Sequence, residues 1–157
     1  MAGKREGGPV GNADMKPDVL KWVDVTIAAA TCYTLHTKPV TLVAAPPAND
    51  FLMFLGARVS FIAGPTATGF SGLSASNDPL TISYTNAAGQ ACGTLTASSF
   101  LNGTSANDIR LMYPTPSATF TPVLAAALVV SIASGDLSAG DCYLIIRTFY
   151  RRMKAGY

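Results

Sequence analysis

The sequence predicts an all-β fold: a single β-sandwich of jelly-roll type that follows an extended N-terminal arm. Three observations lead to this prediction. Apolar and polar residues alternate with a period of two in short segments, no segment has a convincing helical period, and clusters of Gly, Pro and Ser separate the segments. About eight segments of this kind favour a jelly roll, while up-and-down and other Greek-key strand orders stay open.

The chain of 157 residues has the length of one domain with its own core. Residues 1–18 are rich in Gly and Pro, alternate in charge sign and offer almost nothing to bury, so we expect them to form a flexible arm. This arm is either a disordered terminus or a segment that becomes ordered against a neighbouring subunit. Residues 19–157 form the predicted β-sandwich domain.

The first two predicted strands are residues 19–30 and 34–43. In the first, three β-branched residues alternate with three residues that point to the opposite face. The two sets are Val23, Val25 and Ile27, and Trp22, Asp24 and Thr26. Pro39 cannot donate a ladder hydrogen bond, so the second segment is expected to be an edge strand or to bend at this residue.

The middle of the chain contains the strongest apolar stretch, residues 51–63, which predicts a central strand with a bulge at Gly56. A loop rich in small polar residues follows at 64–78. The remaining segments are expected to be two strands that pair across a turn at 87–90, a loop, a short strand, and a connection rich in proline: residues 80–86, 92–100, 101–107, 108–113 and 114–122.

Residues 124–152 predict a closing hairpin, in which two alternating segments are joined by a turn rich in Gly, Ser and Asp at residues 134–141. The return strand has one apolar face and one face that is half apolar and half cationic. The residues of this second face are Tyr143, Ile145, Arg147, Phe149 and Arg151. Such a face is unusual for contact with water alone, so it is expected to need a second cover, such as a neighbouring subunit.

The composition points to packing against other proteins. Charged residues make up 13% of the chain, against about a quarter in a typical domain, and hydrophobic residues make up 49%. A net charge of +2, with no basic stripe in the body, argues against nucleic-acid binding. The longest apolar run is far shorter than the about 20 residues that cross a bilayer, and the polar N-terminus predicts no signal peptide, so we expect a cytoplasmic site of synthesis.

The sequence predicts no enzyme, no cofactor and no metal site. The three cysteines, Cys32, Cys92 and Cys142, are widely spaced and fit buried free thiols better than a disulfide framework or a metal site. His36 is the only histidine and lies on an apparent strand without a nucleophile elbow nearby. The aspartates of the body lie in or beside turns, where they have structural roles; Asp136 and Asp141 lack the dense oxygen spacing of a calcium loop.

The candidate binding residues are cationic and aromatic. The C-terminal cluster of arginines, with aromatic residues nearby, is either a solvated strand end or the rim of a protein-binding surface, because interfaces favour Arg and aromatic side chains. Together with cations of the arm and the only tryptophan, the candidates are Lys4, Arg5, Lys16, Trp22, Tyr143, Arg147, Phe149, Arg151 and Arg152.

Two segments resemble a known family. LHTKPVTLVAAPPANDFLMFLGARVSF, at residues 35–61, is similar to a strand–turn–strand pattern of tailed-phage head proteins, and ALVVSIASGDLSAGDCYLIIRTFYRRM, at residues 127–153, resembles the closing segment of the same proteins. These are capsid decoration (cement) proteins, and the resemblance brackets most of the chain. The turn at Pro46 and Pro47 departs from the family's glycine-rich turn, and the arm is longer and more charged than the family pattern.

The resemblance implies a jelly-roll protein that forms homotrimers on the exterior of the assembled virion capsid, after assembly in the host cytoplasm. Its partner would be the major capsid protein, whose subunits it would bridge against internal DNA pressure; three contacts per trimer would strengthen a weak single contact. No nucleic acid or membrane is expected as a partner. The alternatives are another virion subunit (head fibre, tail or minor coat protein), a carbohydrate-binding β-sandwich, which would need an aromatic platform, and, as a distant possibility, a hydrolase that uses His36.

Overall fold

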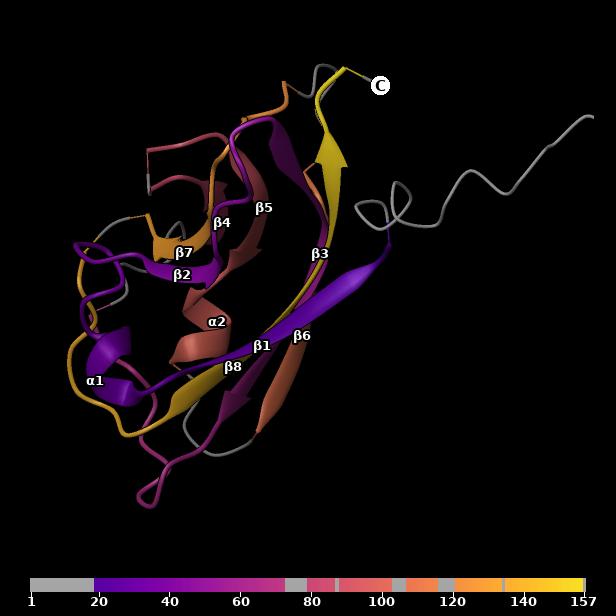
Figure 1. Cartoon of the computed structure of the whole chain (residues 1–157). Coiled ribbons are helices and arrows are strands. Elements are labelled where there is room, and N and C mark those ends of the chain that lie inside the picture. The colour runs from indigo at the N-terminus through magenta and orange to yellow at the C-terminus, as the bar shows by residue number, and fades with distance from the viewer. Residues whose placement is uncertain are drawn as a thin grey trace, which may run out of the picture.

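The computed structural model describes residues 19–72, 79–86, 88–102, 107–115, 121–133 and 135–156. Strands dominate the described part of the chain, and two one-turn helices lie between them (Figure 1). In chain order the elements are β1 (Lys21–Ile27), α1 (Ala29–Cys32), β2 (Val40–Val43), β3 (Asp50–Ile62), β4 (Pro79–Tyr84), β5 (Ala91–Thr96), α2 (Ser98–Leu101), β6 (Asp108–Met112), β7 (Leu128–Ile132) and β8 (Tyr143–Lys154).

The strands form two four-stranded antiparallel sheets that face each other (Figure 1). The strand order is β1-β8-β3-β6 in one sheet, here called the first sheet, and β2-β7-β4-β5 in the second sheet. The pairs are nested in the sequence: β1 pairs with β8, β2 with β7, β3 with β6, and β4 with β5. A chain folded as nested antiparallel pairs and wound into two sheets is a jelly roll, so the predicted β-sandwich is confirmed, while the predicted arm at residues 1–18 lies outside the described residues.

The longest strand pair is β3 with β8, whose register runs from Asp50 opposite Lys154 to Ile62 opposite Tyr143. The register shifts between Phe54 and Gly56, which leaves Leu55 as the extra residue of a β-bulge. Gly56 has a φ of 142°, a conformation that other residues rarely adopt. β3 lies between β8 and β6, so both the central strand and the bulge were predicted correctly.

The core lies between the two sheets. Alternate residues of the first sheet, such as Val59 and Ile146, meet alternate residues of the second sheet, such as Ile82 and Val130. The buried Tyr84 of β4 also donates its hydroxyl to the Leu52 carbonyl of β3, which ties the sheets together by a hydrogen bond. Aromatic rings close one end of the core in edge-to-face or tilted contacts: Tyr33, Phe61, Phe70 and Phe100.

The predicted closing hairpin is wrong. β7 pairs with β2 and β4 in the second sheet, and β8 pairs with β1 and β3 in the first. The segment between them crosses from one sheet to the other and is fixed on the way by a bridge between Ser71 and Ser138. Every residue of β7 is buried, including those of its second face, and the strand lies between β2 and β4. The alternating pattern identified both strands but carries no information about which strands they pair with.

Two predicted strands are shorter than expected. Residues 29–38 form α1 and a series of turns, with Lys38 donating its backbone N–H to the Thr34 carbonyl, so the second strand begins only after Pro39. It is an edge strand, as Pro39 predicted. The predicted strand at residues 92–100 ends at Thr96, and α2 follows. The hairpin of β4 and β5 is confirmed. All three cysteines are free thiols; Cys32 and Cys142 are buried and Cys92 is half-buried.

Gly56→Ala is expected to lower the free energy of unfolding by about 1–3 kcal/mol. Alanine is strained at this φ, and its Cβ would lie 3.2 Å from the Met112 carbonyl oxygen. Chemical denaturation measures the loss. Gly156→Ala is the matched control: its φ is also positive, at 98°, but an added Cβ would meet no described atom within 4 Å. Equal losses in the two variants would show that the close approach to β6 is unimportant.

Candidate functional site

The candidate site is the face of the first sheet that points away from the core, here called the outer face. Successive side chains of a strand point to opposite sides of the sheet. The residues that alternate with the core-facing ones therefore point to the outer face. The side chains on which the site depends are Trp22 and Asp24 of β1, Leu55 and Arg58 of β3, Ile109 and Leu111 of β6, and Ile145, Arg147 and Phe149 of β8. This confirms the orientation predicted for β1 and β8.

Arg147 is the best-anchored side chain of the outer face. Its Nε donates to Asp24 Oδ1 at 2.8 Å and its Nη2 to Asp24 Oδ2 at 2.7 Å, a bidentate pair across β1 and β8. The guanidinium carbon also lies 4.4 Å from the centre of the Trp22 ring, a cation–π contact. The hydrogen bonds from Arg147 lower the pKa of Asp24, and the same hydrogen bonds raise the pKa of Arg147. Trp22 itself remains 58% exposed.

Strand β6 turns its apolar side outward. Met112 is buried, whereas Ile109 and Leu111 are 58% and 55% exposed. On the core side of the same strand, Arg110 donates to Asp108 at 2.9 Å and lies over the Phe100 ring. An alternating strand of a sandwich normally places its apolar side on the core and its polar side in water. The reversal puts two aliphatic side chains in solvent on an edge strand, where a partner can cover them.

Arg58 lies in the middle of the outer face, between Arg147 of β8 and Leu111 of β6. Its cross-strand neighbour is therefore a second arginine, whose charge is already matched by Asp24. The Nε of Arg58 is buried and has no hydrogen-bond partner among the described residues. Neither Arg58 nor the outward residues of β6 were predicted as site residues.

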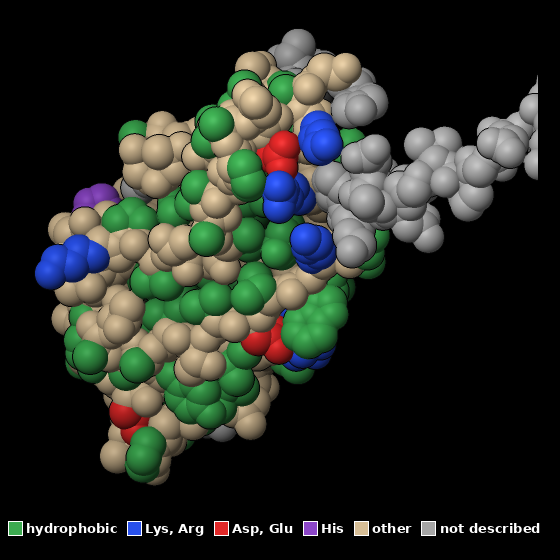
Figure 2. Space-filling model, viewed as in Figure 1, with side chains coloured by type: hydrophobic (Ala, Val, Ile, Leu, Met, Phe, Trp, Pro, Cys, Tyr) green, Lys and Arg blue, Asp and Glu red, His purple; other side chains and the backbone are tan. Residues whose placement is uncertain are grey.

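Cationic side chains gather on the side of the molecule formed by the first sheet, as Figure 2 shows, and large parts of the remaining visible surface lack charge. The other predicted residues of β8 lie as follows: Tyr143, Phe149 and Arg151 share the outer face with Arg147, whereas Arg152 points to the opposite side of the sheet. Lys4, Arg5 and Lys16 lie outside the described residues.

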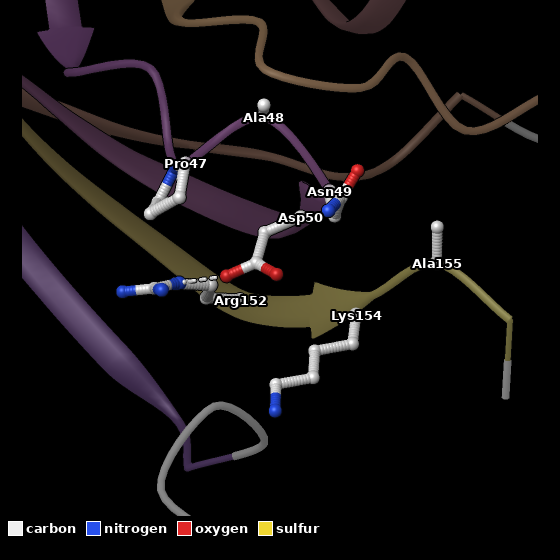
Figure 3. Close-up of a pocket in the computed structure, with 7 residues that line it drawn as sticks. All are labelled: Pro47, Ala48, Asn49, Asp50, Arg152, Lys154 and Ala155. Carbon is white, nitrogen blue, oxygen red and sulfur yellow. Dashed lines mark hydrogen bonds and ion pairs between the residues drawn. The ribbon is translucent and has the colours of Figure 1, made fainter.

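Arg152 belongs to a separate shallow pocket at the end of β3 and β8, lined by the turn at Pro47, Ala48 and Asn49 (Figure 3). Its Nε donates to Asp50 Oδ2 at 2.5 Å. Asp50 is only 5% exposed, so Arg152 neutralises a nearly buried carboxylate where the two strands end. The side chain has a structural partner, which separates it from the candidates of the outer face.

The aspartates, histidine and cysteines that could act in catalysis or metal binding have structural surroundings as well. Asp141 accepts hydrogen bonds from Thr66 and Thr68 backbone N–H groups at 2.6 and 2.9 Å, which lowers its pKa and fixes the loop after β3. Asp136 accepts from Thr37, and His36 Nδ1 lies 3.1 Å from the Ile132 carbonyl oxygen. Burial raises the pKa of the Cys32 and Cys92 thiols to about 12, so both stay protonated at neutral pH.

The described residues contain no group of three or more His, Cys, Asp or Glu side chains that could hold a metal ion. No helix in the same part of the chain is long and apolar enough to cross a membrane.

No known protein family, curated protein or solved structure with which the chain was compared matches it.

Arg147→Gln is expected to return the pKa of Asp24 toward its ordinary value, because glutamine offers no cationic donor. The folded pKa of Asp24 lies below its unfolded value, so the pair stabilises the fold at neutral pH. This contribution is lost as the pH falls below about 4 and through the folded pKa. Thermal unfolding between pH 7 and pH 2 should therefore show a larger acid-induced loss in the wild type than in the variant. A carboxyl NMR titration that gives Asp24 the same pKa in both proteins would contradict the assignment.

Arg152→Met is expected to lower the free energy of unfolding by about 3 kcal/mol, because it leaves the nearly buried Asp50 carboxylate without its partner. Asp50→Asn should cost less, since it removes the buried charge and leaves an arginine that water can reach. Lys154→Met, in the same pocket, is the control and should change little. Urea denaturation measures all three variants. A loss for Asp50→Asn that exceeds that of Arg152→Met would contradict this order.

Proposed function

We propose that the chain is a structural virion protein, a decoration (cement) protein that binds the exterior of an assembled tailed-phage capsid and bridges neighbouring subunits of the major capsid protein. The observation that carries the proposal is the outer face of the first sheet, where Trp22, Ile109 and Leu111 are exposed beside arginines. Aromatic, aliphatic and Arg side chains of this kind are enriched in the centres of protein interfaces.

Two further features support this function. The jelly-roll fold is the one that the resemblance of residues 35–61 and 127–153 to decoration proteins implies. The candidate side chains lie on hydrogen-bonded strands rather than on loops. A rigid surface of this kind suits a protein whose role is to resist force. A homotrimer would present three outer faces at once, and simultaneous engagement would raise the apparent affinity without new contacts.

Purified protein is expected to behave as a trimer in light scattering and to bind emptied, expanded phage heads that were assembled without it. Co-sedimentation measures binding, and electron microscopy of the decorated heads locates the added density. Decorated heads should also resist heating better than undecorated ones. Unexpanded shells are the control and should bind less. Density on tails or fibres instead of the head exterior would favour another virion subunit, and heads that stay bare would contradict the proposal.

A further inference from the structure

The centre of the outer face combines exposed aliphatic side chains with a cation that has no hydrogen-bonded acid among the described residues. Arg58 is flanked by Arg147 on β8 and by Leu111 on β6, and Ile109 lies farther along β6. Asp24 forms its bidentate pair with Arg147 and acts on Arg58 through its charge alone, so Arg58 has no hydrogen-bonded carboxylate among the described residues. The buried, unbonded Nε of Arg58 is therefore a donor that the described part of the chain does not satisfy.

An arrangement of this kind destabilises the isolated chain. A buried N–H without an acceptor costs free energy, and two arginines directly opposite each other on neighbouring strands repel. The exposed Ile109 and Leu111 add an apolar surface that water does not favour. All of these costs would be removed by one event: covering the face with an apolar surface that brings an acceptor to Arg58.

The charges of the face indicate the chemistry of the cover. Its described strand residues include two neighbouring arginines, Arg58 and Arg147, and one acid, Asp24. A complementary surface is therefore apolar and acidic. A second copy that docked by the same face would bring arginines against arginines, so a twofold contact between outer faces is disfavoured.

We propose that the outer face docks onto an apolar surface of another protein, and that a carboxylate of this partner receives Arg58. The inference rests on the proposed function, in which the partner is a subunit of the capsid shell, and it identifies the contact through which that subunit is held. The carboxylate pairs with the guanidinium of Arg58, while the neighbouring aliphatic side chains of β6 exclude water from the ion pair.

The test is Arg58→Leu, measured in the free protein and on heads. In the free protein, leucine removes the repelling charge and the unsatisfied donor, so the melting temperature should rise by a few degrees. On emptied, expanded heads, the same variant should bind about 30-fold more weakly or worse, because the partner's carboxylate is left buried without a cation. A residue with a purely structural role would not give these opposite changes.

Lys38→Leu is the matched control. It removes one positive charge in the exposed turn before β2, away from the outer face, and should alter neither the melting temperature nor head binding beyond a small amount. Arg58→Lys keeps the charge but not the Nε donor, and it should bind heads with an affinity between those of the wild type and Arg58→Leu.

Other outcomes would overturn the proposal. Wild-type affinity for heads in Arg58→Leu would contradict it while leaving the proposed function intact. A lower melting temperature for Arg58→Leu would also contradict it, because Arg58 would then support the free fold. If Ile109→Asp converts an oligomer into a monomer in light scattering, the outer face is occupied by a second copy instead. Heads that the wild type does not bind would contradict the proposed function itself, and the shell partner with it.

Discussion

The antiparallel ladder between β3 and β8 is the interaction on which the rest of the structure depends. It joins the third strand to the last one over the full length of both, and β1 and β6 are added to its two sides. The first sheet is complete only when this pairing forms. The cross-strand neighbours on the outer face are brought together by it. Because its partners are far apart in the sequence, its formation has a large loop-closure cost, which the inner face of the same strands offsets by burying Val59, Phe61, Leu144 and Ile146.

The position of the strands could be predicted from the sequence, but their partners could not. A period of two identified β7 and β8 and put Leu144 and Ile146 on the core side, because alternation reports which face is buried, whereas a nearly continuous apolar run identified β3. It does not report which neighbour completes the hydrogen bonds, so two strands close in sequence were paired although they belong to different sheets. The shortened strands have a similar cause: α1 and α2 are single turns, too short to show a helical period.

The site was predictable where burial followed polarity and unpredictable where it did not. Alternation placed Trp22 on the outward side of β1, and Arg147 and Phe149 on the second face of β8, but only the pairing of β1 with β8 brings them onto one face. On β6 the same reasoning points Ile109 and Leu111 to the core, but Arg110 lies there, held by Asp108 and the Phe100 ring. Arg58 stands in an almost continuous apolar stretch, and only the register shows that it faces Arg147. These positions depend on contacts between strands, which the order of residues within one strand does not contain.

Most of the positions at which the sequence departs from the usual pattern of a β-sandwich lie where a partner could cover them. Natural sequences generally agree with their fold at each level, and departures gather at functional sites. The bulge at Gly56 and the pair of Asp50 with Arg152 follow those rules, because each satisfies its own charges or packing within the chain. In the core, the buried Thr148 hydroxyl is an exception, since it has no hydrogen-bond partner among the described residues. The outward aliphatic residues of β6 and the unbonded donor of Arg58 also depart from those rules, and they lie next to each other on one face. The unbonded Thr148 hydroxyl lies on the core side of the sheet, where no partner can reach it, whereas exposed aliphatic side chains next to an unbonded donor on the outer face have the form of half an interface.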